Sequence, residues 1–463
     1  MSESFFCFHG HFYQPPRGVL FEGAPQPEEL DAAPFRNWNE KIAAECYTPN
    51  ADLGSFALMS FDIGANLLQW LEAHLPETYH KIVQADRDHY SGYSAGNALP
   101  QSAYHTVLPL ASDQDKTTLI KWGLARFEHR FGRPAQGMWL PEMAVDLNTL
   151  QALARNGLQF TLLSQTQIKD GGALPGAGPY WVALPEGSRI AVYVREDKLS
   201  LQLAYGVRDL GGAGLWSRNV LLPHRKRGHR FTLLATDGET FGHYHPGEEN
   251  FLHWLLKFEA GAAGYLVTTL ARDLLENPPQ EYVEVCEDSA WSCAHGLGRW
   301  SEGCPCTPGD SSWKSKLRRA MDSLTVGLDG LYQEAARAAG VDPWPLRDDY
   351  IRVALGQLGP QAFLAEHGLS ALDMTRADAL LSLLQAQVHR QSMYGSSTFS
   401  YDDLDRPEPR YAIANGLAAI QLTFQATGED LAPDFGRKLA LAVSSRSGLT
   451  GADLLDGARR QAD

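Results

Sequence analysis

The 463-residue sequence is short of basic residues, and this shortage limits the partners that it can bind. It contains 40 Lys and Arg against 55 Asp and Glu, which gives a formal net charge of −15 at pH 7. A protein that binds nucleic acid normally presents a basic surface to the phosphates. The basic run at residues 224–230 is short and precedes a predicted strand, where a solvated loop is the simpler interpretation. We therefore expect no nucleic-acid partner.

Long hydrophobic runs are also missing. No stretch of the sequence approaches the roughly 18 consecutive apolar residues that a membrane-spanning helix needs. The first residues, MSESFFCFHGHFYQPPR, lack the basic region of a secretory signal, and their apolar stretch is short. We therefore expect no membrane association and a cytoplasmic location.

Cysteine is scarce, with 6 residues in the chain, which suits a reducing compartment better than a disulfide framework. Cys293, His295, Cys304 and Cys306 offer four possible metal ligands. Their spacing, C-x-H-x₈-C-x-C, departs from the usual pair of C-x₂₋₄-C knuckles of zinc sites. Free thiols in a Trp-rich loop are the simpler interpretation, and a structural zinc site remains the alternative.

The first 275 or so residues alternate β-type and helical segments. The expected strands cover residues 5–8, 137–140, 160–163, 190–194, 231–235 and 265–268, and the expected helices cover 62–75, 116–131, 147–156 and 247–259. Such alternation indicates a parallel sheet, either doubly wound or closed into a barrel. After a Cys- and Trp-rich stretch, the chain becomes mainly helical, with helices expected at 314–339, 376–394, 411–426 and 436–443.

Two of the expected strands stop at a carboxylate. The segment 136–140 runs into Pro141 and Glu142, and the segment 232–236 runs into Asp237, Gly238 and Glu239. Parallel α/β proteins present catalytic groups at the C-terminal ends of buried strands. Two carboxylates placed in this way, with Trp and Tyr nearby in sequence, suit chemistry on glycosidic bonds. Either carboxylate alone is explained more simply as an ordinary strand-end cap.

A group of polar and aromatic residues follows the first expected strand. His9 and His11 point to the same face of that strand, and Gln14 lies shortly after them. Two imidazoles at this spacing can bind a metal or hydrogen-bond to sugar hydroxyls, although a purely structural pair is the alternative. Elsewhere, three glycines within residues 211–214 precede Leu215 and Trp216, where we expect a mobile loop near the site.

Taken together and in this order, the motifs resemble glycoside hydrolase family 57. That α-glucan-active group includes amylases, 4-α-glucanotransferases and branching enzymes. The resemblance rests on five ordered motifs, at residues 9–15, 96–105, 139–142, 237–242 and 291–300. The cysteine-bearing motif and the string Tyr401–Asp405 resemble a bacterial subgroup whose catalytic domain is followed by a helical domain of unknown function.

The resemblance implies an α/β fold in three parts. An incomplete (β/α)₇ barrel would cover residues 1–285, and a Trp- and Cys-rich loop at 286–310 would complete the site. A mainly α-helical C-terminal region would cover residues 311–463. The activity implied is that of a retaining hydrolase or transglycosylase on the α-1,4 bonds of glycogen, starch or maltooligosaccharides. Neither a cofactor nor a metal would take part in the chemistry.

The resemblance also assigns roles to residues. Glu142 falls on the family's nucleophile and Asp237 on its general acid/base. Asp237 must then hold a proton near neutral pH, which burial or a nearby carboxylate (Glu142 or Glu239) would favour by raising its pKa. The candidates for substrate binding are His9, His11, Gln14, Trp38, His105, Trp139, Glu239, His243, Trp291, His295 and Trp300.

Two other interpretations remain open at this stage. One is a metal-dependent hydrolase, such as a polysaccharide deacetylase, with His9, His11 and Asp237 as ligands. The other is a non-enzymatic glucan-binding protein built on a decayed enzyme, against which the presence of both Glu142 and Asp237 argues. The motifs leave hydrolysis, transfer and branching undecided, and they do not predict the oligomeric state.

Overall fold

The chain consists of two compact units. A computed structural model describes residues 3–16 and 29–462. Of the described residues, unit 1 comprises 3–14, 29–102 and 126–292, and unit 2 comprises 15–16, 103–125 and 293–462. Unit 2 therefore includes residues 103–125 in addition to the C-terminal part of the chain. The division at residues 285 and 310 expected from the sequence stays a prediction.

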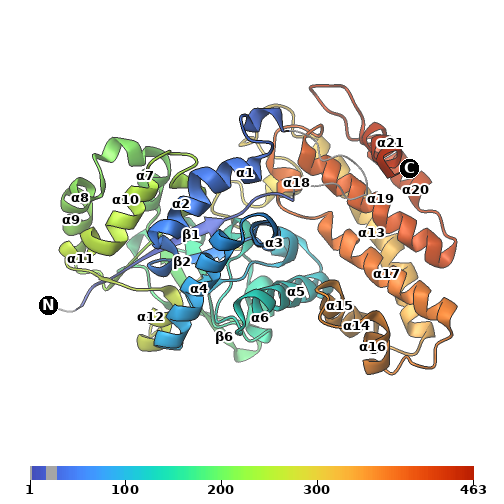
Figure 1. Ribbon diagram of the computed structural model, residues 1–463, viewed down its shortest axis with the longest axis horizontal. Helices are drawn as coiled ribbons and strands as arrows, with labels where there is room; N and C mark the ends of the chain where they lie inside the picture. Colours follow the sequence, from blue (N-terminus) through green and yellow to red (C-terminus); the bar gives the residue numbers. More distant parts are fainter. Residues whose placement is uncertain (1–2, 17–28, 463) are drawn as a thin grey trace. The chain divides into compact units, whose positions relative to one another are not determined.

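Parallel strands form the framework of unit 1 (Figure 1). Strand β1 (Phe5–Phe12) pairs in parallel with β2 (Ser60–Ile63) and with β7 (Phe231–Asp237). Strand β3 (Ala98–Leu99) extends the sheet beyond β2, and β8 (Leu266–Val267) pairs with the start of β1. In a second sheet, β4 (Phe160–Ser164) and β6 (Arg189–Arg195) are parallel, and β5 (Tyr180–Ala183) joins β6 in the antiparallel direction.

Residues 137–139 connect the two sheets. Gly137 forms a parallel bridge with Phe160 of β4, and Trp139 forms one with Gln101, which lies just beyond β3. At the other junction, the Glu196 N–H after β6 donates to Leu233 O in β7 at 2.8 Å. The order β1, β2, β3, 137–139, β4, β6, β7 therefore closes into a ring of parallel segments with imperfect joints. This ring confirms the predicted incomplete barrel.

The observed helices and strands agree best with the expected ones where the expected segment is long. The helix expected at 116–131 is α5 (Asp113–Phe131), and that at 147–156 is α6 (Leu147–Arg155), whose N-cap Asp146 accepts from Thr149 N. The helix expected at 62–75 is shorter, because Ser60–Ile63 forms β2 and α3 begins at Ala65 (Ala65–His74). The strand expected at 137–140 is reduced to isolated bridges.

The mobile loop predicted at residues 211–216 is wrong. Residues Ala213–Trp216 form helix α8, and the Trp216 side chain is 1% exposed. Its Nε1 donates to Gln202 Oε1 at 3.1 Å, and its ring packs against Phe251. Trp216 therefore belongs to the core of unit 1 and is not available to close over a site.

Unit 2 is mainly helical, as predicted for the C-terminal region. Helices α13 (Trp313–Ala338), α17 (Met374–Ser392) and α19 (Pro407–Thr427) pack on one another, and α20 (Ala432–Leu439) and α21 (Gly451–Ala462) join them (Figure 1). The apolar stripe of α17, which includes Leu380, Leu383 and Leu384, is buried in this core. Among the described residues, no helix has both the length and the apolar character to cross a membrane.

The first part of α5 belongs to unit 2 and is tied to the later helices by buried charges. Asp115 pairs with Arg347 at 3.1 Å and with Arg390 at 2.8 Å, and these three side chains are almost fully buried. Burial would raise the pKa of Asp115, but the two guanidinium groups lower it to about 2. The Trp122 Nε1 group donates to Asp348 O at 3.0 Å.

We expect a fragment that ends at Asp310 to be insoluble or unstable. It would retain Asp115 and Trp122 but lose Arg347, Arg390 and Asp348, so the Asp115 carboxylate would lose both of its cationic partners. In the full chain, Asp115→Asn should reduce the free energy of unfolding by about 3–5 kcal/mol, because it removes the carboxylate that pairs with the buried Arg347, while Arg390 keeps its pair with Asp329. Soluble yield and denaturant unfolding measure both effects, and a soluble, stable 1–310 fragment would contradict this account.

Candidate active site

The C-terminal end of β1 meets a buried carboxylate from β2. Asp62 Oδ1 lies 2.8 Å from His9 Nε2, and Asp62 Oδ2 lies 2.8 Å from His11 Nδ1. Gln101 Nε2 also donates to Asp62 Oδ2, at 2.5 Å. Because β1 and β2 are parallel and in register, with His11 opposite Asp62, the contact follows directly from the strand pairing. Asp62 therefore holds both histidines that the sequence singled out.

The shared carboxylate gives the two histidines different charge states. Burial lowers the pKa of both imidazoles, and for His9 this effect outweighs the raising effect of Asp62. For His11, the Asp62 carboxylate, with help from Asp237 and Glu239, outweighs burial and raises the pKa to about 9. At neutral pH, His11 is therefore an imidazolium and His9 is neutral.

Aromatic rings cover the two histidines. Trp139 stacks on His11 with ring centroids 4.4 Å apart and on His9 at 5.1 Å. The Trp291 ring packs edge-on against Trp139 at 5.1 Å, and it stays partly exposed. The Arg195 guanidinium, at the end of β6, lies 4.8 Å from the centre of the Trp291 ring. Both tryptophans predicted here thus line the same barrel end as His11.

Glu142 lies in a strained turn immediately after the 137–139 segment. Its backbone adopts φ 59° and ψ 17°, a left-handed conformation that is uncommon for residues other than glycine, and Met143 follows with φ 46°. The Trp291 N–H donates to Glu142 O at 3.1 Å, and Ser292 Oγ donates to Glu142 Oε2 at 2.9 Å. Strain of this kind persists only where surrounding contacts hold it, and it is concentrated at functional sites.

Asp237 and Glu239 follow β7 on the other side of β1. A Cβ atom at Gly238, between them, would lie 2.1 Å from the Phe12 ring, so this turn requires glycine. Burial raises the pKa of Asp237; His11 opposes this shift and Glu142 adds to it. Burial and the neighbouring Asp237 raise the pKa of Glu239 to about 7. The raised pKa expected for Asp237 is therefore confirmed in direction.

The two carboxyl groups differ in their access to solvent. Glu239 is 2% exposed, and its Oε1 accepts from the Tyr47 hydroxyl at 2.7 Å and from the Tyr13 N–H at 3.3 Å. The Gln14 side chain hydrogen-bonds to the same Tyr47 hydroxyl. Asp237 remains partly exposed. Glu239 thus serves internal hydrogen bonds, and Asp237 is the more accessible group of the pair.

Trp38 and His243 lie together in unit 1. Their rings make an edge contact with centroids 5.9 Å apart, and His243 Nδ1 lies 2.6 Å from Glu45 Oε2. The Lys41 ammonium lies 4.7 Å from the centre of the Trp38 ring. Both side chains are partly exposed, as binding groups require.

Three predicted binding residues belong to unit 2. His105 is buried, and its Nδ1 hydrogen-bonds to Ser396 Oγ at 2.7 Å. Trp300 is buried as well, and it lines a cavity of about 240 Å³ together with Arg318, Tyr394 and Phe399. His295 lies among the late cysteines. Their role in binding stays a prediction.

Several important groups were not found from the sequence. Asp62 was assigned to a helix, although Ser60–Ile63 followed by Gly64 repeats, in a shorter form, the pattern of an apolar strand that meets a carboxylate. Tyr47 and Arg195 lie outside the five motifs, and Ser292 lies inside the motif at 291–300 but was given no role. Their contacts with Glu239, Trp291 and Glu142 arise from the tertiary structure.

The geometry does not favour a metal at the barrel end. His9 uses both ring nitrogens for hydrogen bonds, to Asp62 and to Ser60 Oγ at 3.1 Å, which leaves none for a metal. Two groups of described residues have ligand atoms within 4.8 Å of one another, and neither contains His9, His11 or Asp237. One consists of Glu196, His224 and His229, and the other of Cys293, His295, Cys304 and Cys306.

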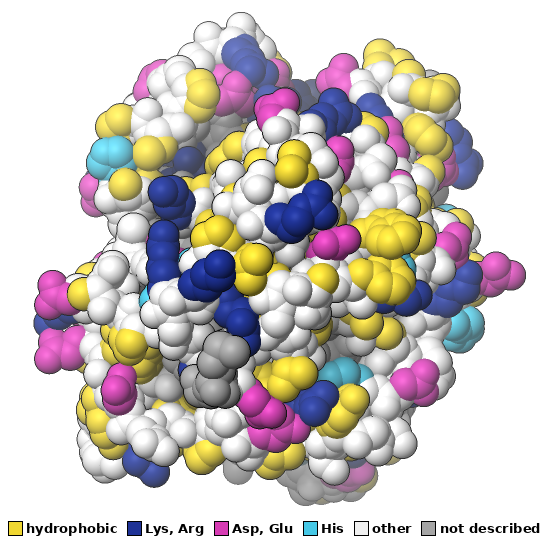
Figure 2. All heavy atoms as spheres, turned by 90° about the vertical axis from the view of Figure 1, so that its left-hand side faces the viewer, with side chains coloured by type: hydrophobic (Ala, Val, Ile, Leu, Met, Phe, Trp, Pro, Cys, Tyr) yellow, Lys and Arg dark blue, Asp and Glu magenta, His cyan; other side chains and the backbone are white. Residues whose placement is uncertain are grey.

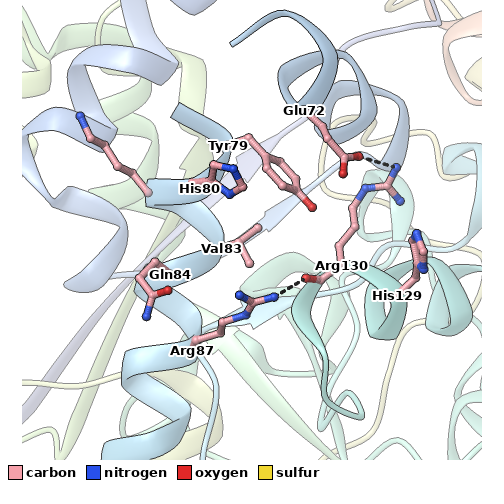
Figure 3. Close-up of a pocket in the computed structure, with 9 residues that line it drawn as sticks. Glu72, Tyr79, His80, Val83, Gln84, Arg87, His129 and Arg130 are labelled. Atoms are coloured by element: carbon pink, nitrogen blue, oxygen red, sulfur yellow. Dashed lines mark hydrogen bonds and ion pairs between the residues drawn. The ribbon is translucent and has the colours of Figure 1, made fainter. Parts of the chain in front are cut away.

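A hollow in unit 1 lacks the two carboxyl groups that the sequence singled out. Figure 3 shows a hollow between α3, α4 (Pro76–Tyr93) and α5, where Arg130 lies 3.9 Å from Glu72 and accepts, through its carbonyl, a hydrogen bond from Arg87. Neither Glu142 nor Asp237 lines this hollow. On the face shown in Figure 2, basic side chains are interspersed with acidic and neutral ones.

Comparison with known sequences identifies two regions. A family model described as "Glycosyl hydrolase family 57" matches residues 33–285, more than half of the chain, and a domain of unknown function, DUF3536, matches residues 310–454. "Alpha-amylase 1" of Dictyoglomus thermophilum is 26% identical over 141 residues, which cover 30% of this chain and 19% of that protein. The chain thus matches about a fifth of that relative's length.

Solved structures share the fold at low identity. The exo-type maltose-forming amylase of Pyrococcus sp. ST04 superposes with a TM-score of 0.70 at 16% identity, over 94% of this chain and 82% of that one. A branching enzyme of Thermococcus kodakaraensis gives a TM-score of 0.59 at 14% identity, over 99% and 94% of the two chains. At these identities the similarity concerns the fold alone.

We predict that Asp62→Asn lowers the pKa of His11 from about 9 towards its ordinary value of 6.5, because the substitution removes the strongest raising charge. Catalytic turnover should fall on the order of 10²-fold as the imidazole loses its charge and its fixed position. NMR titration of the imidazole signals measures the pKa. Ser60→Ala is the control, since it removes a partner of His9 and leaves the His11–Asp62 pair. An unchanged His11 pKa in Asp62→Asn would contradict the assignment.

Proposed function

Because the chain belongs to glycosyl hydrolase family 57, we propose that it is a retaining enzyme that cleaves or transfers α-1,4-linked glucan. The observation that carries the proposal is the pair formed by Glu142 and Asp237. Glu142 is held in a strained turn at the barrel end, and its charge adds to the effect of desolvation that raises the pKa of Asp237. Retaining glycosidases require one ionised carboxylate and one protonated carboxyl group across the scissile bond.

In this proposal Glu142 attacks the anomeric carbon and forms the glycosyl-enzyme. Its Oε2 accepts a hydrogen bond from Ser292 Oγ at 2.9 Å, which helps to hold the carboxylate in place. The left-handed backbone at Glu142 and Met143 fixes the direction of the side chain before substrate binds. The nucleophile therefore needs little reorganisation during the reaction.

Asp237 first donates its proton to the oxygen of the leaving sugar, and it then accepts a proton from the incoming water or sugar hydroxyl. Glu239, with a pKa of about 7, is the other candidate for this role. Its oxygen is occupied by Tyr47 and Tyr13, and its side chain is buried. Asp237 is partly exposed and lies opposite His11 in the strand register, which favours it as the group that meets substrate.

The surroundings suit a sugar substrate. Trp291 and Trp38 are partly exposed, so their flat faces are available to pyranose rings. The His11 imidazolium places a positive charge close to Asp237 and Glu239. An α-glucan is the substrate class that follows from the motifs, and the amylase and branching activities named for similar proteins support it.

The direct test is incubation of the full chain with maltoheptaose, followed by chromatography of the products. Shorter sugars alone would establish hydrolysis, and longer sugars in addition would establish transfer. New α-1,6 linkages would establish branching. The absence of any change in maltoheptaose, glycogen or starch, for folded protein over a range of pH, would contradict an α-glucan substrate.

We expect Glu142→Ala to reduce glucan turnover by roughly 10⁴-fold or more, since the proposed covalent intermediate forms on the Glu142 carboxylate. Added azide should restore part of the activity and yield a β-glycosyl azide, because it enters the space left by the carboxylate. Glu186→Ala is a matched control: Glu186 also follows a proline in a 3₁₀ turn with φ 63°, and it makes only an exposed ion pair with Arg155. Near-normal turnover in Glu142→Ala would remove Glu142 from the mechanism.

Asp237→Asn should lose about 10²- to 10⁴-fold on natural glucans, whose leaving groups need a proton, and much less on glucosyl fluoride. Because burial raises the pKa of Asp237, kcat/KM of the wild type should fall as pH rises through that pKa, and this limb should flatten in Asp237→Asn. Glu239→Gln serves as the comparison and should lose equally on both substrates. If the leaving-group dependence appears in Glu239→Gln instead, Glu239 is the acid/base. The carboxyl groups of Glu142 and Asp237 are expected ~5–5.5 Å apart in a crystal structure.

A further inference from the structure

The cysteine-bearing segment of unit 2 brings four potential ligand atoms to one point. We propose that Cys293, His295, Cys304 and Cys306 bind a single Zn²⁺ ion as a closed, structural site. The four ligand atoms all lie within 4.8 Å of one another. The proposal does not depend on the catalytic pair, because neither Glu142 nor Asp237 takes part in it, and it gives His295 a structural role in place of the predicted role in substrate binding.

The distances fit one tetrahedral ion. Cys293 Sγ lies 3.4 Å from Cys304 Sγ and 4.0 Å from Cys306 Sγ, and His295 Nδ1 lies 3.3 Å from Cys304 Sγ and 3.2 Å from Cys306 Sγ. With Zn–S bonds of about 2.3 Å and Zn–N bonds of about 2.0–2.1 Å, a tetrahedron separates two sulfurs by about 3.8 Å and a sulfur and a nitrogen by about 3.6 Å. The observed separations lie close to both values.

Other uses of these thiols fit less well. A disulfide needs an S–S distance of about 2.05 Å and would employ two cysteines, which leaves the third thiol and the imidazole without a purpose. A multi-iron cluster places several metal ions between its ligands and therefore needs ligand atoms further apart than these. Three thiolates and one imidazole around one ion form a common structural zinc shell.

The local fold explains why the unusual spacing still makes a site. A 3₁₀ turn at Gly298–Trp300 reverses the chain, and the Gly303 N–H donates back to Gly298 O at 2.9 Å. This closed turn brings the 293–295 arm against the 304–306 arm, although eight residues separate His295 from Cys304. The Cys306 N–H also points at Cys304 Sγ, at 3.4 Å, a contact that stabilises a thiolate.

The surroundings supply positive charge for the site. Three thiolates and a neutral imidazole around Zn²⁺ carry a net charge of −1, which is costly to bury without a cation nearby. The Lys314 side chain is fully buried, its Nζ donates to Thr307 Oγ1 at 3.0 Å, and it interacts electrostatically with Cys304 and Cys293. Arg299 acts on Cys304 in the same way.

The composition of the shell points to a structural role. All four tetrahedral positions are filled by protein atoms, so no position remains for water or substrate, as catalytic zinc would need. Cys293 and Cys304 are buried, and His295 and Cys306 are exposed, so the ion can enter from solvent. Cys293 directly follows Ser292, the donor to Glu142, in the chain.

The test is the metal content of the full chain purified in reducing buffer without chelator. Plasma mass spectrometry should find about one zinc per chain. Cys304→Ser and Cys306→Ser should each lose most of the zinc, and Cys286→Ser should keep it, because Cys286 is the nearby cysteine outside the cluster. Far-UV circular dichroism identifies any variant that fails to fold, and Cys306→Ser changes an exposed side chain and is the less disruptive of the two.

A second measurement does not depend on variants. The wild-type chain, stripped of metal under reduction, should bind one equivalent of Co²⁺ and develop the intense thiolate-to-cobalt absorption and visible bands of a tetrahedral site. Zinc should then displace the cobalt. Reduced wild-type protein that binds neither ion, unchanged zinc content in folded Cys306→Ser, or iron in place of zinc would each overturn the proposal.

Discussion

The carboxylate of Asp62 is the group on which the arrangement of the barrel end depends. It is fully buried, and it is bonded at the same time to His9, His11 and Gln101. A buried carboxylate is tolerated only where its charge and hydrogen-bonding capacity are satisfied. The two imidazoles and the amide therefore cannot move separately, and the ends of β1, β2 and β3 are fixed to one another by side chains as well as by the backbone.

His11 is charged because of its contact with Asp62, and this charge acts in turn on the carboxyl groups that follow β7. An imidazolium beside Asp237 and Glu239 partly offsets two acidic groups that would otherwise repel each other at close range. The two carboxyl groups still differ, because Tyr47 and Tyr13 bind Glu239 and leave Asp237 accessible. Asp237 and Glu239 carry the same functional group and lie two residues apart. The difference in their exposure and hydrogen bonding therefore comes from the residues around them.

Much of this could be predicted from the sequence, and the limits have physical causes. Long periodic helices such as α13 and α17, and the long strands β1 and β7, were found because burial imposes a regular pattern over many residues. Strands β2 and β3 are too short for such a pattern, and Asp62 was missed together with β2. Trp216 was misjudged because flanking glycines indicate a turn but do not reveal that the aromatic ring is buried.

The most irregular part of the ring is also the part that carries the proposed nucleophile. At residues 137–140 the strand is reduced to two bridges, and a Cβ atom at Gly137 would lie 2.5 Å from the Phe160 ring. If a regular strand continued through Pro141, the direction of the Glu142 side chain would be set by the alternation of side chains between the two faces of the sheet. The interrupted pairing instead allows the left-handed turn at Glu142 and Met143, which is held by the Trp291 N–H and by Ser292. Imperfect closure of the barrel is therefore a condition for presenting this carboxylate, because a fully paired strand could not make the turn.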